Sequence, residues 1–276
     1  MKLTYYAGDS VGPNFGDQLN CWMWPRLMPD FFDEDDSRLF LGIGTIISQW
    51  IPGNAQKLVL GAGTTPEIAP MLDATWKILS VRGPLTARVL GISEDYSVTD
   101  PAMLISNFIK RDADTTGPVT LMIHHARSKR GNWKLACALA GINCIDPHDD
   151  VDHVIQTLSR SRLVLAEAMH AAIVADALRV PWIPVVVHDH INAFKWSDWC
   201  QSMCLDYRPV VLTPLLDGSA ALGARIRAKI MPYYLATQLS KVMRTTAPML
   251  SSDTVIAARR DRLLELVEMA KRERVI

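Results

Sequence analysis

Short apolar runs alternate with amphipathic stretches along this chain, a pattern typical of proteins in which strands and helices follow one another. The stretch 163–187, LVLAEAMHAAIVADALRVPWIPVVV, shows it most clearly. An apolar strand leads to Glu167, apolar residues recur at helical spacing over 171–178, and Pro181 ends the helix before a second strand. His170 therefore lies where a helix begins, and the unpaired N–H groups of such a junction favour an anionic ligand. The alternative is a histidine that packs in place and satisfies a neighbouring carbonyl.

The first hundred residues repeat a strand that ends in a turn. We predict strands at residues 2–7, within LFLGIGT (39–45) and LVLGAGT (58–64), and at 77–82 and 96–101. Helices are predicted at 17–27, with Asp17 as the N-cap, and at 84–90 between Gly83 and Gly91. The glycine turns let a backbone approach a ligand closely. Neither turn continues to the third glycine of a dinucleotide fingerprint, so an NAD site is not expected.

A polar segment, NFIKRDADTTGP (107–118), divides this part from a second half of the same kind. Strands are predicted there at 119–125, 143–146, 163–165 and 182–187, and helices at 133–140, at 151–159 and after His170. Helices between buried strands imply parallel sheets, whose ligand sites lie outside the carboxyl ends of the strands. The sequence thus predicts an α/β fold with two domains, 1–108 and 109–216, that face a cleft.

The last part of the chain, 217–276, carries only helical patterns, at 220–230, 233–244 and 253–274. We interpret it as a helical C-terminal tail. Residues 220–247 combine apolar residues with arginine and lysine and contain no acidic residue. Such a stretch either packs against its own domain or lies on an anionic membrane as a peripheral contact.

Composition narrows the class of protein. The 276 residues include 29 basic and 29 acidic side chains, so the basic surface needed for nonspecific nucleic-acid binding is not expected. The amino terminus lacks an apolar signal core and the apolar runs are strand-sized, so we expect a cytoplasmic protein without a membrane span. No carboxylate cluster has magnesium-binding spacing, and no metal or cofactor is expected.

The cysteines give little support to a disulfide framework or a structural zinc site. There are five of them and no CxxC pair, so we interpret them as reduced thiols. Cys200 and Cys204 would share a helix face near His188 and His190, which leaves a metal site there as an alternative.

Five segments resemble, in the same order, the recurring blocks of the polysaccharide pyruvyl transferases. They are NFGDQLN (14–20), SVRGPLTARVLG (80–91), TDPAML (99–104), AEAMHAAIVADALRVPWIPV (166–185) and NAFKWSDW (192–199). The last segment makes the chain look most similar to the exopolysaccharide ketal-pyruvyltransferases of the succinoglycan type. One feature departs from the pattern: many members carry Ser-x-Arg before the histidine, whereas this chain has Glu167, Ala168 and Met169. In this chain, any anion-binding role of that arginine is either absent or supplied by another residue.

The resemblance implies transfer of a pyruvyl group from phosphoenolpyruvate to two hydroxyls of a sugar, which leaves a cyclic ketal and phosphate. It implies a sugar acceptor in an exopolysaccharide precursor and two Rossmann-like domains similar to the GT-B glycosyltransferases. We expect the acceptor to be a lipid-linked oligosaccharide, although the sequence leaves its link to lipid open. A donor with a phosphate and a carboxylate needs fixed cations and N–H donors. Arg82, His170 and Lys195 are the residues expected to bind it. His170 and Lys195 share two roles, the general acid for the methylene carbon and the group that holds the leaving phosphate, in an order the sequence leaves open.

Each candidate site residue also has a structural interpretation beside its functional one. Glu167 could accept a sugar proton, tune the pKa of His170 or cap its own helix. Arg82 could instead extend to solvent, and Lys195 could cover the neighbouring aromatic rings. Four residues are expected to bind the acceptor, or else to form turns, caps and a solvated loop: Asn14, Asp17, His124 and His125. The two histidines precede a basic group formed by Arg127, Lys129 and Arg130.

Two further functions remain possible for such a chain. A GT-B-type glycosyltransferase would use a nucleotide sugar on the same fold, and a noncatalytic polysaccharide-assembly protein would need neither Arg82 nor His170. Fold by itself does not decide among them.

Overall fold

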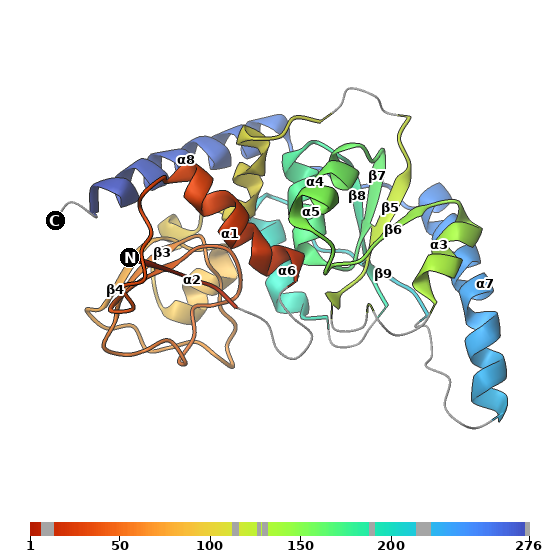
Figure 1. Cartoon of the computed structure of the whole chain (residues 1–276), viewed down its shortest axis with the longest axis horizontal. Coiled ribbons are helices and arrows are strands. Elements are labelled where there is room, and N and C mark those ends of the chain that lie inside the picture. Colours follow the sequence, from red (N-terminus) through yellow and green to blue (C-terminus); the bar gives the residue numbers. More distant parts are fainter. Residues whose placement is uncertain are drawn as a thin grey trace. The chain divides into compact units, whose positions relative to one another are not determined.

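The structure is a computed structural model that describes residues 1–6, 14–111, 116–125, 128, 132–187, 191–213 and 222–273, with the side chains of 222–228 and 273 left out. The chain forms two compact units (Figure 1). The first unit holds Met1–Phe108, Asn192–Tyr207 and Ser251–Ile276, and the second holds Ile109–Ile191 and Arg208–Leu250.

The first unit is built on a four-stranded parallel sheet in the order β1-β2-β3-β4. The strands are β1 (Lys2–Thr4), β2 (Arg38–Leu41), β3 (Gln56–Leu60) and β4 (Trp76–Ser80). The helices are α1 (Phe15–Leu27), α2 (Pro84–Leu90), α6 (Ala193–Ser202) and α8 (Asp253–Glu273), with 3-10 helices η1 (Glu94–Tyr96) and η2 (Pro101–Asn107). Apolar residues of β2 and β3 such as Leu41 and Val59 are fully buried, as expected for a parallel sheet covered on both faces.

The prediction of a strand at 96–101 is wrong. Only one isolated bridge, between Val81 and Ser97, continues the sheet there, and η1 and η2 flank it. Asp100 caps η2 by accepting a hydrogen bond from the backbone N–H of Ala102 at 2.9 Å. Because Pro101 has no N–H for a ladder and fits the first position of a helix, the segment turns into a helix instead.

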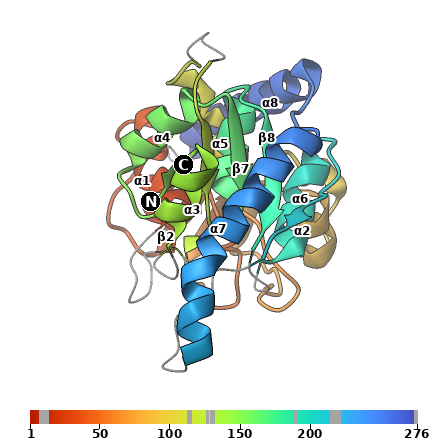
Figure 2. The same cartoon turned by 90° about the vertical axis from the view of Figure 1, so that its right-hand side faces the viewer.

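The second unit has a five-stranded parallel sheet in the order β6-β5-β7-β8-β9. Its strands are β5 (Val119–Met122), β6 (Asn143–Ile145), β7 (Leu163–Ala166), β8 (Trp182–Val186) and β9 (Val210–Val211). Its helices are α3 (Trp133–Ala140), α4 (Val151–Ser159), α5 (Met169–Ala177) and α7 (Leu222–Thr245). Figures 1 and 2 show α4 and α5 on one face of this sheet and α3 and α7 on the other. The order of strands reverses between β5 and β7, which makes that point the expected place for a ligand.

Among the described residues, the predicted helical tail does not form a separate structural unit. α7 packs on the core of the second unit through Leu235 and Leu239, and α8 contacts β3 and β4 of the first. Helix α7 also runs through Pro232, so the two helices predicted at 220–230 and 233–244 are one. Residues 192–207, expected in the second domain, pack with the first unit. The predicted domains were contiguous stretches of sequence, and such stretches could not show this assignment. Which unit a segment joins depends on packing partners that lie far from it in the sequence. No helix in the described part is long and apolar enough to cross a membrane.

Candidate functional site

Arg82 is fixed at the carboxyl end of β4 by a buried network. Its side chain is fully buried, so the expectation that it could extend to solvent is wrong. Its Nε donates to Oδ2 of Asp198 at 3.0 Å and its Nη1 donates to Oγ1 of Thr45 at 2.9 Å. Nη2 has no hydrogen-bond partner among the described residues. The guanidinium is therefore held by two of its nitrogens, while the third retains donors for another group.

Asp198 also caps the helix that follows Arg82. Its Oδ1 accepts from the backbone N–H of Thr86 at 2.9 Å and its Oδ2 from the Thr86 hydroxyl at 2.6 Å. The N-cap residue of α2, Gly83, has no side chain for this purpose. A Cβ at Gly83 would lie 2.0 Å from the carbonyl oxygen of Asp198, so only glycine lets α6 approach and supply the cap. Sequence reasoning missed Asp198, although it lies within the segment NAFKWSDW.

The two glycine turns pack directly on this arginine. Thr45 and Gly63 form a parallel bridge after β2 and β3. A Cβ at Gly63 would lie 2.4 Å from Cζ of Arg82, so the turn needs a glycine to admit the guanidinium. The group that lies against the backbone of these turns is the buried guanidinium of Arg82, and close approach of a ligand to them stays a prediction.

Lys195 lies one turn before Asp198 on α6 and is partly buried. Burial lowers its pKa from the ordinary value, and the positive charge of Arg82 lowers it further, while Asp17 and Glu67 oppose the shift. The structure thus brings together two of the residues expected to bind the donor, together with two carboxylates. Glu67 had no sequence signal; its hydrogen bond from Thr65 lowers its own pKa.

Asn14, not Asp17, is the N-cap of α1. Its Oδ1 accepts from the backbone N–H groups of Gly16 at 2.9 Å and Asp17 at 3.3 Å, and its Nδ2 donates to the Asp17 carboxylate. The helix begins at Phe15, so Asp17 falls in the first turn, where a negative charge is stabilised by the helix dipole.

Glu167 lies at the reversal point of the second sheet, where it joins three strand ends. The side chain is fully buried. Its Oε2 accepts from the backbone N–H of His124 at 3.0 Å and its Oε1 from that of Val187 at 2.8 Å, so it connects the ends of β5, β7 and β8. The alternative that it caps its own helix is wrong, because the N-cap of α5 is Ala168 and the two oxygens of Glu167 accept the N–H groups of His124 and Val187.

The histidines gather at the same carboxyl edge. His124 and His125 follow β5 with ring centroids 4.3 Å apart, and His148, after β6, lies 6.2 Å from His125. Nδ1 of His148 is 2.9 Å from Oδ1 of Asp146, a pair that sequence reasoning missed. Burial opposes ionisation of Asp146, but its hydrogen bonds with His148 hold its pKa below the ordinary value.

His170 lies in the first turn of α5, directly after β7. It is half-buried, and its Nε2 is shielded from solvent. The basic group expected beside His125, formed by Arg127, Lys129 and Arg130, lies outside the described residues, as do His188 and His190. Cys200 is buried in α6, whereas Cys204 is exposed beyond its end. In the described part of the chain, no group of three or more His, Cys, Asp or Glu is placed to hold a metal ion.

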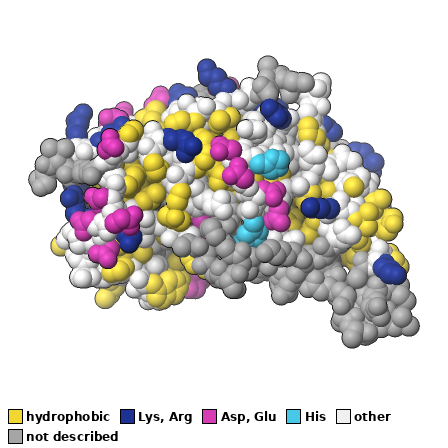
Figure 3. Space-filling view, in the orientation of Figure 1, with side chains coloured by type: hydrophobic (Ala, Val, Ile, Leu, Met, Phe, Trp, Pro, Cys, Tyr) yellow, Lys and Arg dark blue, Asp and Glu magenta, His cyan; other side chains and the backbone are white. Residues whose placement is uncertain are grey.

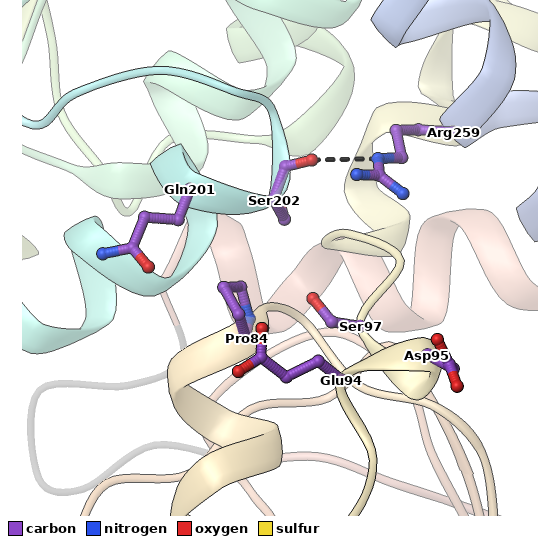
Figure 4. A pocket seen from close by; sticks show the side chains of 7 residues that line it. All are labelled: Pro84, Glu94, Asp95, Ser97, Gln201, Ser202 and Arg259. Carbon is purple, nitrogen blue, oxygen red and sulfur yellow. Dashed lines mark hydrogen bonds between the residues drawn. The ribbon is translucent and has the colours of Figure 1, made fainter.

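A separate pocket of about 400 Å³ lies in the first unit (Figure 4). It is lined by Pro84, Glu94, Asp95, Ser97, Gln201, Ser202 and Arg259. Arg259 is anchored by its Nε, which donates to the backbone carbonyl of Ser202 at 2.9 Å. Two carboxylates and one guanidinium in the lining make this pocket unsuited to a donor with several negative charges.

Comparison with known proteins agrees with the arrangement of these blocks. A family model described as polysaccharide pyruvyl transferase matches residues 16–190, a range that includes both Arg82 and His170. The succinoglycan biosynthesis protein ExoV of Rhizobium meliloti (strain 1021) is 37% identical over 215 residues, which cover 76% of this chain and 67% of that protein. No significant match was found among solved structures. The chain belongs to the polysaccharide pyruvyl transferase family.

Proposed function

We propose that this chain transfers a pyruvyl group from phosphoenolpyruvate to two hydroxyls of one sugar in an exopolysaccharide precursor, forming a cyclic ketal and releasing phosphate. The family supports the class of reaction. The observation that supports the donor is the arginine at the carboxyl end of β4, whose buried guanidinium is held by Asp198 and Thr45 and still has Nη2 to offer. A planar fork in a fixed orientation suits a carboxylate or a phosphate.

Lys195 supplies a second cation beside Arg82. The mutual repulsion of the two charges contributes to the lowered pKa of Lys195 and is relieved when an anion binds between them. The carboxylates of Asp17 and Glu67 offset part of this positive charge. The two neighbouring cations support a site that binds a small anion with two or three negative charges.

The chemistry requires a proton on the methylene carbon of the donor. Protonation there makes the neighbouring carbon an oxocarbenium-like centre, which a sugar hydroxyl attacks with loss of its proton. Phosphate then leaves, and the second hydroxyl adds to the same carbon and loses its proton. We assign His170 and Lys195 to proton delivery and to holding the phosphate.

Glu167 is proposed as a positioning residue for the edge that carries His124 and His170. Both of its oxygens already accept backbone N–H groups, which leaves it little capacity to take a sugar proton. His124, His125, Asn14 and Asp17 remain proposed contacts of the acceptor, which we take to be a lipid-linked oligosaccharide met at the cytoplasmic side of a membrane.

Turnover of phosphoenolpyruvate with candidate lipid-linked oligosaccharides tests the proposal, with phosphate release and product mass as readouts. We expect His170→Ala to lower turnover by about two orders of magnitude or more while the fold survives. Arg82→Lys is expected to weaken the apparent affinity for phosphoenolpyruvate although the charge is kept. Arg88→Lys is the matched control, since Arg88 on α2 forms an exposed ion pair with Glu94 of η1.

Two results would overturn this proposal. Thermal protection by a sugar nucleotide but not by phosphoenolpyruvate would indicate a glycosyltransferase. Full biological function after both Arg82 and His170 are replaced would indicate a noncatalytic assembly protein.

A further inference from the structure

Over residues 229–245, where the side chains of helix α7 are described, one face of the helix packs on the second unit. Leu235, Ala236, Leu239 and Val242 are buried at the spacing of one helix face, and α3 is the neighbouring helix. The other side presents large apolar side chains to solvent: Ile230, Tyr233 and Tyr234 are 58%, 57% and 51% exposed. In Figures 1 and 2 the amino-terminal end of α7 extends past the sheet and past α3.

The charges on the exposed side of α7 are all positive. Lys229, Lys241 and Arg244 are exposed there, and the helix contains no aspartate or glutamate. Along the chain the nearest acidic residues are Asp217 and Asp253. Figure 3 shows hydrophobic side chains over this helix with Lys and Arg beside them. A partner for this surface must therefore combine negative charge with an apolar layer.

A shallow groove runs between α3 and α7 on this side. It has a volume of about 390 Å³ and is lined by Leu139, Tyr233, Ala236, Thr237, Ser240 and Arg244. Leu139 adds a side chain that is 45% exposed. The groove thus has apolar and hydroxyl-bearing walls and one guanidinium, a combination that suits an amphiphile with a phosphate at one end.

A second copy of the chain is a poor occupant. In a twofold dimer the same surface meets itself, so Lys229, Lys241 and Arg244 would face their own copies without any carboxylate of α7 between them. Tyrosine prefers the boundary between water and lipid, and clustered basic residues bind anionic headgroups. A bilayer surface meets both requirements of the helix.

We propose that the exposed face of α7, with the adjoining groove of α3, binds the surface of an anionic lipid bilayer. Tyr233, Tyr234 and Ile230 enter the headgroup region, and Arg244 and the lysines contact lipid phosphates. The helix lies along the surface and does not cross it. This contact is independent of pyruvyl transfer, because no residue of the proposed reaction lies on α7.

Co-sedimentation of the full chain with vesicles tests the contact. We expect binding to vesicles of phosphatidylcholine with phosphatidylglycerol, weak binding to phosphatidylcholine alone, and loss of binding as salt rises. Each basic residue contributes roughly a fivefold factor, so Lys229→Gln, Lys241→Gln and Arg244→Gln together should weaken partitioning about a hundredfold. Ile230→Ser, Tyr233→Ser and Tyr234→Ser together should weaken it about tenfold or more without changing net charge.

The matched control removes the same charge elsewhere. Arg260→Gln, Arg262→Gln and Lys271→Gln alter three basic residues of α8 that pair with Asp261, Glu265 and Glu268, and should leave binding near that of the parent chain. Equal loss in the control, absence of binding at low salt, or concentration-dependent dimerisation abolished by the tyrosine changes would overturn the proposal. The assay contains no phosphoenolpyruvate, so a chain that binds vesicles but fails to turn over the donor contradicts the proposed function alone.

Discussion

Removal of the Asp198 carboxylate should destabilise the first unit more than any change on its surface. Asp198 and Arg82 are both fully buried, and Asp198 accepts hydrogen bonds from Nε of Arg82 and from the N–H and hydroxyl of Thr86. Asp198→Ala leaves the guanidinium buried without its counter-charge, which costs about 3–5 kcal/mol. Loss of the cap on α2 adds about 1 kcal/mol. We therefore expect the free energy of unfolding to fall by about 4–6 kcal/mol.

Urea unfolding measures this loss, and hydrogen exchange of peptides from α2 and α6 assigns it to the first unit. Asp261→Asn is the control, because it breaks an exposed ion pair with Arg260 and should change little. Arg82→Met combined with Asp198→Leu should recover much of the stability, since it removes both buried charges at once. If Asp198→Ala cost no more than Asp261→Asn, or if the double variant were as unstable as the sum of the single ones, the reasoning would be refuted.

Three other changes test particular parts of the structure. Glu167→Gln should destabilise the second unit by about 1–3 kcal/mol in urea unfolding, because an amide has one acceptor oxygen where two backbone N–H groups need one each. Equal stability would mean that the strand ends do not depend on the carboxylate. Burial lowers the pKa of Lys195 below its ordinary 10.5, so at pH values between the folded and unfolded pKa the unfolded chain binds more protons. Stability should therefore rise with pH across that interval, and Lys195→Met should flatten the rise; parallel curves for both chains would contradict the shift. Gly83→Ala should lower the melting temperature strongly, since its Cβ would lie 2.0 Å from the Asp198 carbonyl oxygen, whereas Gly91→Ala has open space and only the cost of a positive φ. A similar melting temperature for the two variants would show that α6 can move away.

Local patterns were sufficient where an element is decided within one or two turns of chain. The helices expected at 133–140 and 151–159 have those bounds in the structure. The helix after Arg82 also begins at Pro84 and ends before Gly91, which adopts the left-handed conformation that stops a helix. Capping, proline and glycine preferences are properties of neighbouring residues, so they can be read without knowledge of the fold.

Local patterns failed where two neighbouring solutions compete. Asn14 and Asp17 are both good caps, and the structure selects Asn14, whose side chain bonds to Gly16 and Asp17. The pattern predicted two helices, at 220–230 and 233–244, yet α7 continues through Pro232 because Leu235 and Leu239 hold the helix on the core of the second unit. Burial at such positions outweighs the local preference.

The sequence by itself determined the alternation of strands and helices, the parallel sheets and the family. Apolar periodicity and the blocks that resemble the family both lie within short segments of the chain, so they can be recognised without the fold. Only the tertiary structure decided how Arg82 is held, since its partner Asp198 is 116 residues away and comes from α6, which lies between β8 and β9 in the chain. It also decided that β5 lies between β6 and β7, which places Glu167 against the backbone of His124. Strand order and long-range pairing depend on how apolar faces of distant segments fit together, and no window of neighbouring residues contains that information.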